Sequence, residues 1–327
     1  MHTVATARSD LLSRAELDAR GLSSRAIAAA IDSGLLHRVH SGWYVENRVW
    51  DAASPEGRHL LQVVAVHSHQ RGGDAVSSLT SAAVLHGLPL FRLTPQRVHV
   101  SGASLGGHVT ATDVARHQTA VPEEDRTSVD GVACTSLART VADMVRLAMP
   151  EAGLSIADAA LRRVAWDDAE RTYDVDAAED LRARVGECMQ RQARARGVRR
   201  GRYVLSIADG RAQLPGESVS RLYLLRLGFA TPRLQVPIPA PGGGNYLVDF
   251  GLDDVDAWGE YDGEGKYLDP QLRGAKTPEE VLLREKERED WIRGTTHRRF
   301  PRWGKSSIGS AQALGIRLAK FHITPPG

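Results

Sequence analysis

Residues 246–262 read YLVDFGLDDVDAWGEYD, and this stretch decides the expected fold of the C-terminal part of the chain. YLVDF (246–250) and WGEYD (258–262) are short segments rich in apolar and aromatic residues, which predicts two β-strands. Pairing of the two strands as a hairpin would bring Asp249 close to Glu260. Side chains alternate along a strand, so Glu260 and Asp262 share one face. Burying an unpaired carboxylate is costly, so these acids need a partner.

The residues before this stretch add a helix and a strand. PGES (215–218) opens a predicted helix that runs to Leu227 and ends at Gly228, with Glu217 in its first turn. RLQVPI (233–238) then predicts a short strand. Glu217 therefore lies at the helix end where a ligand would be held.

These acids suggest a metal site. Asp249 and Glu260 would be direct ligands, Asp262 either a ligand or a residue that holds a water molecule, and Glu217 an outer ligand. Oxygen ligands of this kind suit Mg²⁺ or Mn²⁺ rather than zinc. Lys266, in GEGKY (263–267), would orient or deprotonate a water molecule, or neutralise a phosphate oxygen. The alternative reading of the same charges is a set of salt bridges between helices.

The order helix-Glu, strand-Asp, strand-Glu-x-Asp resembles the PD-(D/E)XK nuclease superfamily, and most nearly its Vsr-like endonucleases, over about residues 215–305. The resemblance implies an α/β domain with a central mixed sheet that hydrolyses DNA with a divalent cation. Its catalytic residues would be Glu217, Asp249, Glu260, Asp262 and Lys266.

The sequence departs from the superfamily at one position. The usual lysine two residues after Glu260 is Asp262, and Lys266 lies four residues further on. Either the lysine role has moved to Lys266, or the site binds a metal and DNA without cutting.

The N-terminal residues predict a different module. Ser13-Arg-Ala-Glu16 is typical of a capping box that opens a short helix. Ser23 or Ser24 would cap a second helix, over residues 25–32, and residues 35–45 would form two short strands. Helix, turn, helix and hairpin in this order are typical of a winged helix-turn-helix.

Such a module would place its second helix in a DNA major groove and its hairpin on the backbone. Ser24 and Arg25 are the expected contacts of the helix, and Arg38 and His40 those of the hairpin. The alternative is a protein-interaction module with the same fold.

LLSRAELDARGLSSRAIAAAIDSGLLHRVHSGWYV resembles the N-terminal winged-helix domain of AbiEi-type antitoxins, over about residues 9–46. Weaker similarity to longer proteins with this domain follows at 77–90 and 131–146. The resemblance implies a DNA-binding repressor and a nucleotidyltransferase-like toxin as partner.

An arginine-rich segment, RQARARGVRRGR (191–202), holds six arginines and no acid. One interpretation is a solvated connector, and the other is a phosphate-contacting arm with Arg199 and Arg200 as contacts.

Length and composition limit the class of protein. The chain has 327 residues, a net charge of +2 and two cysteines, which excludes a disulfide scaffold, and it has no apolar stretch of about 18 residues that would span a membrane. We expect a cytoplasmic α+β protein of several domains. The expected parts are a winged helix (1–50), a mixed middle region (51–190), an arginine-rich linker (191–214) and the nuclease-like domain (215–327). The oligomeric state is not predicted.

Three functions are therefore open. The first is a DNA-acting protein with a metal-dependent endonuclease domain. The second is an antitoxin-type transcriptional regulator whose nuclease fold is silent. The third is a toxin–antitoxin partner binder that does not contact nucleic acid.

Overall fold

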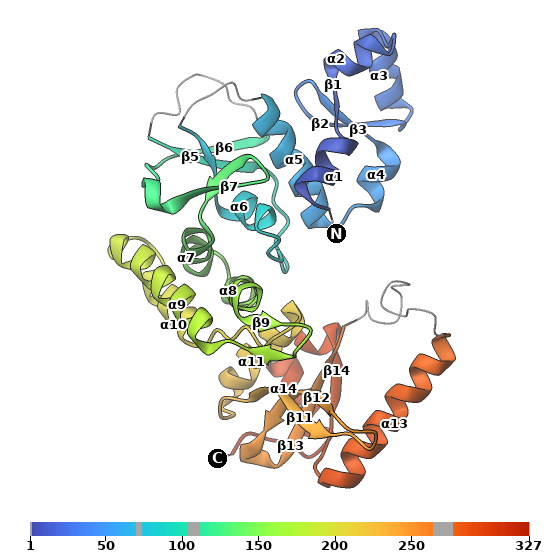
Figure 1. The fold of residues 1–327 in the computed structure, drawn as a ribbon, viewed down its shortest axis with the longest axis vertical. Coiled ribbons are helices and arrows are strands. Elements are labelled where there is room, and N and C mark those ends of the chain that lie inside the picture. Colours follow the sequence, from blue (N-terminus) through green and yellow to red (C-terminus); the bar gives the residue numbers. More distant parts are fainter. Residues whose placement is uncertain (1, 70–73, 104–111, 264–276, 327) are drawn as a thin grey trace. The chain divides into compact units, whose positions relative to one another are not determined.

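The computed structural model describes residues 2–69, 74–103, 112–263 and 277–326. The chain divides into two compact units, and each is built from two stretches of sequence. Unit 1 comprises Met1–Ile156 and Glu179–Ser206, and unit 2 comprises Ala157–Ala178 and Ile207–Gly327. The two boundaries before residue 200 fall inside the helices α8 (Pro150–Ala165) and α9 (Val175–Arg191). The expected mixed α and β fold is confirmed (Figure 1).

Unit 1 begins with the helix–turn–helix–hairpin order that the sequence predicts. Ser13 and Glu16 form the capping box of α2, and Ser23 rather than Ser24 caps α3. A small core of Leu17, Ile27 and apolar residues of the hairpin holds the pieces together. The elements are α1 (Val4–Asp10), β1 (Leu12–Ser13), α2 (Arg14–Ala19), α3 (Ser24–Asp32), β2 (Leu36–His40) and β3 (Trp43–Glu46), with the strand order β1-β3-β2.

The rest of unit 1 surrounds a five-stranded mixed sheet with the order β6-β5-β4-β8-β7. Its strands are β4 (Val76–Ser77), β5 (Val98–Gly102), β6 (Val114–Gln118), β7 (Arg126–Val129) and β8 (Val132–Thr135). Its helices are α4 (Asn47–Ala52), α5 (Pro55–His69), α6 (Leu79–Leu85), η1 (Glu123–Asp125), α7 (Leu137–Leu147), the first part of α8, most of α9, and α10 (Val198–Ser206).

The prediction of an arginine-rich linker over residues 191–214 is wrong. Residues 198–206 form α10, whose Val198, Gly201 and Val204 are buried. Gly201 packs closely against α9, because a Cβ there would lie 3.1 Å from the sulfur of Met189. The apolar positions of the segment decide its structure, since its arginines can point outward while Val198 and Val204 are buried.

Unit 2 holds the mixed sheet that the sequence predicts for the C-terminal part. Its order is β11-β12-β13-β14, with β13 and β14 parallel and the other pairs antiparallel. The elements are β9 (Trp166–Asp167), β10 (Thr172–Tyr173), α11 (Pro215–Leu227), β11 (Arg233–Pro239), β12 (Asn245–Leu252), η2 (Asp253–Val255), β13 (Ala257–Asp262), α13 (Pro278–Thr296), β14 (Arg302–Gly304), η3 (Lys305–Ile308) and α14 (Ala311–Ala319).

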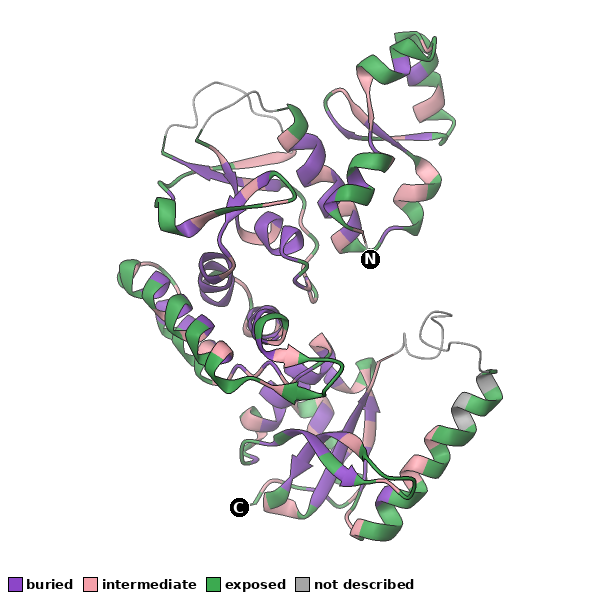
Figure 2. Cartoon of the chain, viewed as in Figure 1, coloured by how far each residue is buried: buried purple, intermediate pink, exposed green. Residues whose placement is uncertain are grey.

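Buried contacts fix the helices of unit 2 to this sheet. Trp303 of β14 stacks on Phe250 of β12 and donates from its indole nitrogen to Ser220 Oγ of α11 at 2.8 Å. Ile292 of α13 joins a core cluster with residues of β11, β12 and β13. Most residues of β12 and β13 are buried, whereas α13 is exposed along most of its length (Figure 2). No helix in the described ranges is both long enough and apolar enough to span a membrane.

Candidate functional site

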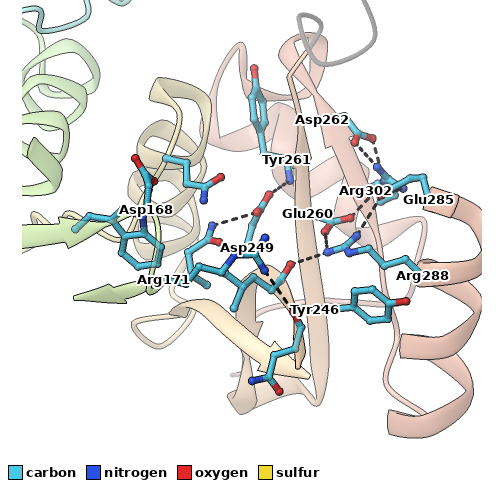
Figure 3. Close-up of a pocket in the computed structure, with 15 residues that line it drawn as sticks. Asp168, Arg171, Tyr246, Asp249, Glu260, Tyr261, Asp262, Glu285, Arg288 and Arg302 are labelled. Carbon is cyan, nitrogen blue, oxygen red and sulfur yellow. Dashed lines mark hydrogen bonds and ion pairs between the residues drawn. The ribbon is translucent and has the colours of Figure 1, made fainter. Parts of the chain in front are cut away.

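A cavity of about 500 Å³ lies in unit 2 and is lined by both of its stretches of sequence. Side chains of the β9–β10 hairpin form one side, α13 and β14 form the other, and strands β11 to β13 lie between them (Figure 3). Five carboxylates and three guanidinium groups line it: Asp168, Asp249, Glu260, Asp262 and Glu285, with Arg171, Arg288 and Arg302. The cavity wall therefore carries more negative than positive groups.

Asp249 lies in the middle of this cavity, as the predicted hairpin requires. The register Phe250↔Gly259 brings it beside Glu260 on the neighbouring strand. Asp249 Oδ2 accepts from the backbone N–H of Tyr261 at 2.9 Å, and Oδ1 accepts from Gln235 Nε2 at 3.3 Å. The buried carboxylate thus finds its partners on both adjacent strands.

Gln235 connects Asp249 to Glu217. Its Nε2 lies 3.4 Å from Glu217 Oε2, and that oxygen also accepts from the backbone N–H of Gln213 at 2.8 Å. Gln235 has a φ of 48°, in the left-handed region that costs a non-glycine residue about 1 kcal/mol. Strained backbone of this kind is concentrated at functional sites, and here it occurs at the residue that bridges two of the predicted site acids.

Glu260 is the third acid at this point, and only 6% of it is exposed. Its Oε1 accepts from Arg288 Nη2 at 2.5 Å. Its Oε2 accepts no hydrogen bond within the described ranges and lies 3.6 Å from Arg302 Nε. Burial raises the pKa of Glu260, Arg288 opposes that shift, and the nearby charge of Asp249 adds to it.

Asp262 does not join the other acids as predicted. Arg302 of β14 is paired with Glu260 of β13 in the parallel register of these strands. Its guanidinium contacts both carboxylate oxygens of Asp262, at 2.6 and 3.1 Å. In the part of the chain that the structure describes, no three His, Cys, Asp or Glu side chains are placed to hold a metal ion. The expected ligand set of Asp249, Glu260 and Asp262 is therefore not formed, because an arginine takes the third carboxylate.

Lys266, the predicted helper of the water molecule, lies outside the described residues. Arg288, on the predicted helix 279–293, was expected only as a possible phosphate contact, and sequence patterns indicate neither Arg302 nor the β9–β10 hairpin. Arg288 and Arg302 stand in a basic segment with no motif to single them out, and the hairpin precedes the nuclease-like segment by about forty residues. Only strand pairing and tertiary packing bring these groups to the cavity.

The predicted DNA contacts of the N-terminal module differ in how exposed their side chains are. Arg25 and Arg38 are exposed, and the Oγ of Ser24 accepts from Arg14 Nη2 at 3.0 Å. His40 is buried, and its Nδ1 lies 2.6 Å from Asp113 Oδ2. The prediction for His40 is wrong, because the ring is turned into unit 1.

Two arginines of the arginine-rich segment are engaged by the protein itself. Arg199 is exposed, but Arg200 donates to the backbone carbonyl of Arg146 at 2.5 Å, near the end of α7. Arg191 pairs with the buried Asp125, also at 2.5 Å. Arg200 is therefore a helix-end contact and not a free phosphate ligand.

Comparison with known proteins gives two relatives. Both are uncharacterized proteins, one from each of two strains of Mycobacterium tuberculosis, and each is 29% identical over 256 residues. The match covers 76% of this chain and 84% of each relative. No protein-family profile matches the chain.

Proposed function

We propose that the chain is a DNA-binding protein whose unit 2 hydrolyses phosphodiester bonds with the help of Mg²⁺ or Mn²⁺. The observation that carries the proposal is the pairing of Asp249 and Glu260 at one cavity, with Glu217 joined to Asp249 through Gln235. The three acids come from a helix start and two adjacent strands, in the order that the nuclease superfamily uses.

Two neighbouring carboxylates, those of Asp249 and Glu260, are the donors that a divalent cation would use here. Glu260 Oε2 is buried without a hydrogen-bond donor in the described ranges, and Asp249 lies beside it. More carboxylates than guanidinium groups line the wall, so a phosphate would meet net negative charge. Asp249 and Glu260 would hold the ion, and Glu217 would support Asp249 through Gln235. Bound there, the ion would neutralise phosphate oxygens and lower the pKa of a water molecule.

The protein's own groups have distinct tasks in this proposal. Arg288 and Arg302 line the same cavity, and a guanidinium suits phosphate oxygens because its donors form a planar fork. Gln235 and the backbone N–H of Tyr261 orient Asp249. The cavity would thereby align a phosphodiester next to the carboxylates that hold the cation.

DNA binding is also proposed for the N-terminal module. Its α2, α3 and β2–β3 hairpin follow the winged-helix order, and Arg25 on α3 and Arg38 on the hairpin are exposed. These two arginines are our proposed DNA contacts.

A second candidate function is an antitoxin-type regulator with a silent nuclease fold, paired with a nucleotidyltransferase-like toxin. One observation favours it: Asp262 replaces the usual lysine and is bound to Arg302 at 2.6 Å. In that case the N-terminal module would bind DNA and unit 2 would not cut it.

The first test is nicking of supercoiled plasmid with Mg²⁺ or Mn²⁺. We expect cleavage by the wild type, loss in Glu260→Gln, and retention in Glu287→Gln, whose exposed carboxylate lies on α13. Absence of nicking by the wild type, combined with specific binding of DNA upstream of its own gene, would establish the regulator instead.

A second test is independent of turnover. Mn²⁺ should raise the melting temperature of the wild type and leave the double variant Asp249→Ala/Glu260→Ala unchanged. Equal shifts in both proteins would exclude a metal at this cluster.

A further inference from the structure

The β9–β10 hairpin supplies an aromatic ring to the wall of the cavity. Trp166 lines the cavity, and its indole nitrogen donates to Asp168 Oδ1 at 2.8 Å. The guanidinium of Arg162 lies 4.4 Å from the ring centroid and covers one face. The antiparallel register Tyr173↔Trp166 fixes the backbone of the tryptophan. The ring is thus held in place at the wall of the cavity.

A second ring borders the same cavity. Tyr246 of β12 lines it, is half-buried, and lies 5.9 Å from the guanidinium carbon of Arg288. Arg171, at the turn of the hairpin, is exposed on the side of the cavity opposite Arg288 (Figure 3). Aromatic faces and guanidinium groups therefore flank the carboxylates of Asp249 and Glu260.

This combination is the one that proteins use to bind single-stranded nucleic acid. Bases stack on aromatic rings, and basic side chains follow the backbone. A base within a duplex has no free face, because its neighbours stack on both sides. The cavity, at about 500 Å³, has the size of a pocket for one small ligand rather than that of a long groove.

We infer that the cavity takes an unpaired nucleotide, whose base stacks on Trp166 while Arg171 contacts an adjacent phosphate. The inference rests on the proposed function and specifies its substrate class: single-stranded DNA or an unpaired end, rather than an intact duplex. Trp166 is then a positioning residue for the strand and not a group that takes part in hydrolysis.

The test measures binding, so its result does not depend on cleavage. Fluorescence anisotropy with Ca²⁺ compares a labelled single-stranded oligonucleotide with the duplex of the same sequence. We expect Trp166→Ala to weaken single-strand binding by roughly tenfold, and to leave duplex binding by the N-terminal module unchanged. Trp166→Phe should retain most of the affinity, and Arg171→Gln should reduce the salt dependence of single-strand binding.

Trp291→Ala is the matched control, because this tryptophan is on the exposed surface of α13 in the same unit and does not line the cavity. A single-strand affinity unchanged in Trp166→Ala, or lowered equally in Trp291→Ala, overturns the inference. So does equal loss of single-strand and duplex binding. If Trp166→Ala fails to fold, the comparison of Trp166→Phe and Arg171→Gln with the wild type decides. Failure of nicking alone counts against the proposed function and not against the binding preference.

Discussion

Arg302 contacts both carboxylate oxygens of Asp262, at 2.6 and 3.1 Å, from the parallel neighbouring strand. The same guanidinium lies 2.9 Å from Glu285 and 3.2 Å from Glu289. Burial lowers the pKa of Arg302, but Asp262 and the surrounding carboxylates outweigh that effect and raise it. Arg302 therefore stays charged and neutralises acids that would otherwise repel one another.

Replacing Arg302 should destabilise the protein, because the carboxylates around it would then repel one another. Arg302→Gln leaves several carboxylates without their cation, and we expect a loss of roughly 3 kcal/mol in unfolding free energy. We also expect a larger Mn²⁺-induced rise in melting temperature than in the wild type, because Asp262 becomes available as a ligand. Scanning fluorimetry with and without Mn²⁺ measures both effects. The control is Arg298→Gln, which removes an arginine that pairs with Asp253 and Asp256 at the sheet's other end. Identical Mn²⁺ shifts in the two variants would contradict the prediction.

The buried pair of Asp158 and Arg221 joins the two stretches of unit 2. Its oxygen and nitrogen are 2.5 Å apart, and both side chains are almost wholly buried. Burial raises the pKa of Asp158, and Arg221 opposes that shift. Arg221→Met should cost about 3–5 kcal/mol, because it leaves a buried carboxylate unpaired.

Adding Asp158→Asn to that variant should recover part of the loss. The amide oxygen can still accept from the backbone N–H of Asp209, which lies 2.7 Å from Asp158 Oδ1. Urea titrations of the single and double variants give the difference. A double variant less stable than Arg221→Met would rule out the unpaired charge as the cause.

His59 makes unit 1 sensitive to acid. Burial lowers the pKa of His59 to about 4, and its hydrogen bond with Gln62 opposes the shift. The unfolded chain takes up a proton near pH 6.5, and the folded protein only near pH 4. Stability is therefore lost as the pH falls through this window, by roughly 2 kcal/mol between pH 7 and pH 5.

His59→Asn should reduce this pH dependence, since asparagine does not titrate, but not abolish it, because burial also lowers the pKa of His99 to about 4. His322→Asn, at an exposed position in unit 2, is the control and should keep the wild-type profile. Urea titrations at both pH values, with hydrogen exchange of α5 as the local probe, measure the effect. An unaltered pH profile in His59→Asn would disprove the assignment.

Gly216 sets the approach of α11 to β13. A Cβ at this position would lie 2.1 Å from the buried ring of Tyr261, whose backbone N–H donates to Asp249. Gly216→Ala should cost at least about 1–3 kcal/mol and should weaken Mn²⁺ binding, because Glu217 and Asp249 are displaced. Gly294→Ala in α13 meets no atom within 4 Å and should be neutral or slightly stabilising. Circular dichroism melts of both variants, with and without Mn²⁺, provide the comparison.

The elements with strong local signals could be predicted from the sequence. The helix α11 begins at Pro215 and ends at Leu227 as predicted, because proline suits a first helical turn and Gly228 takes a φ of 96° after it. The pairing of β12 with β13 also follows from their short connection. Asp249 and Glu260 are neighbours for that reason.

The remaining parts of the site depend on contacts between distant residues. Nothing near Asp262 in the sequence indicates that Arg302 will pair with it, since their strands are joined through α13. The sequence around Trp166 likewise does not indicate that its side chain lines a cavity. The linker predicted over 191–214 is wrong because the many arginines of this segment make it resemble a solvated connector. Its two apolar residues Val198 and Val204 are buried in unit 1.

The division of each unit into two stretches affects how the protein is made. During synthesis, unit 1 is complete only when residue 206 has emerged from the ribosome, after residues 157–178 of unit 2 are already outside. Residues 157–178 can then pack only after the sheet of unit 2 has been synthesised. A gene fragment starting at residue 207 would encode the sheet without Asp158 or Trp166. A gene fusion that transfers unit 2 intact must therefore also carry residues 179–206, which belong to unit 1.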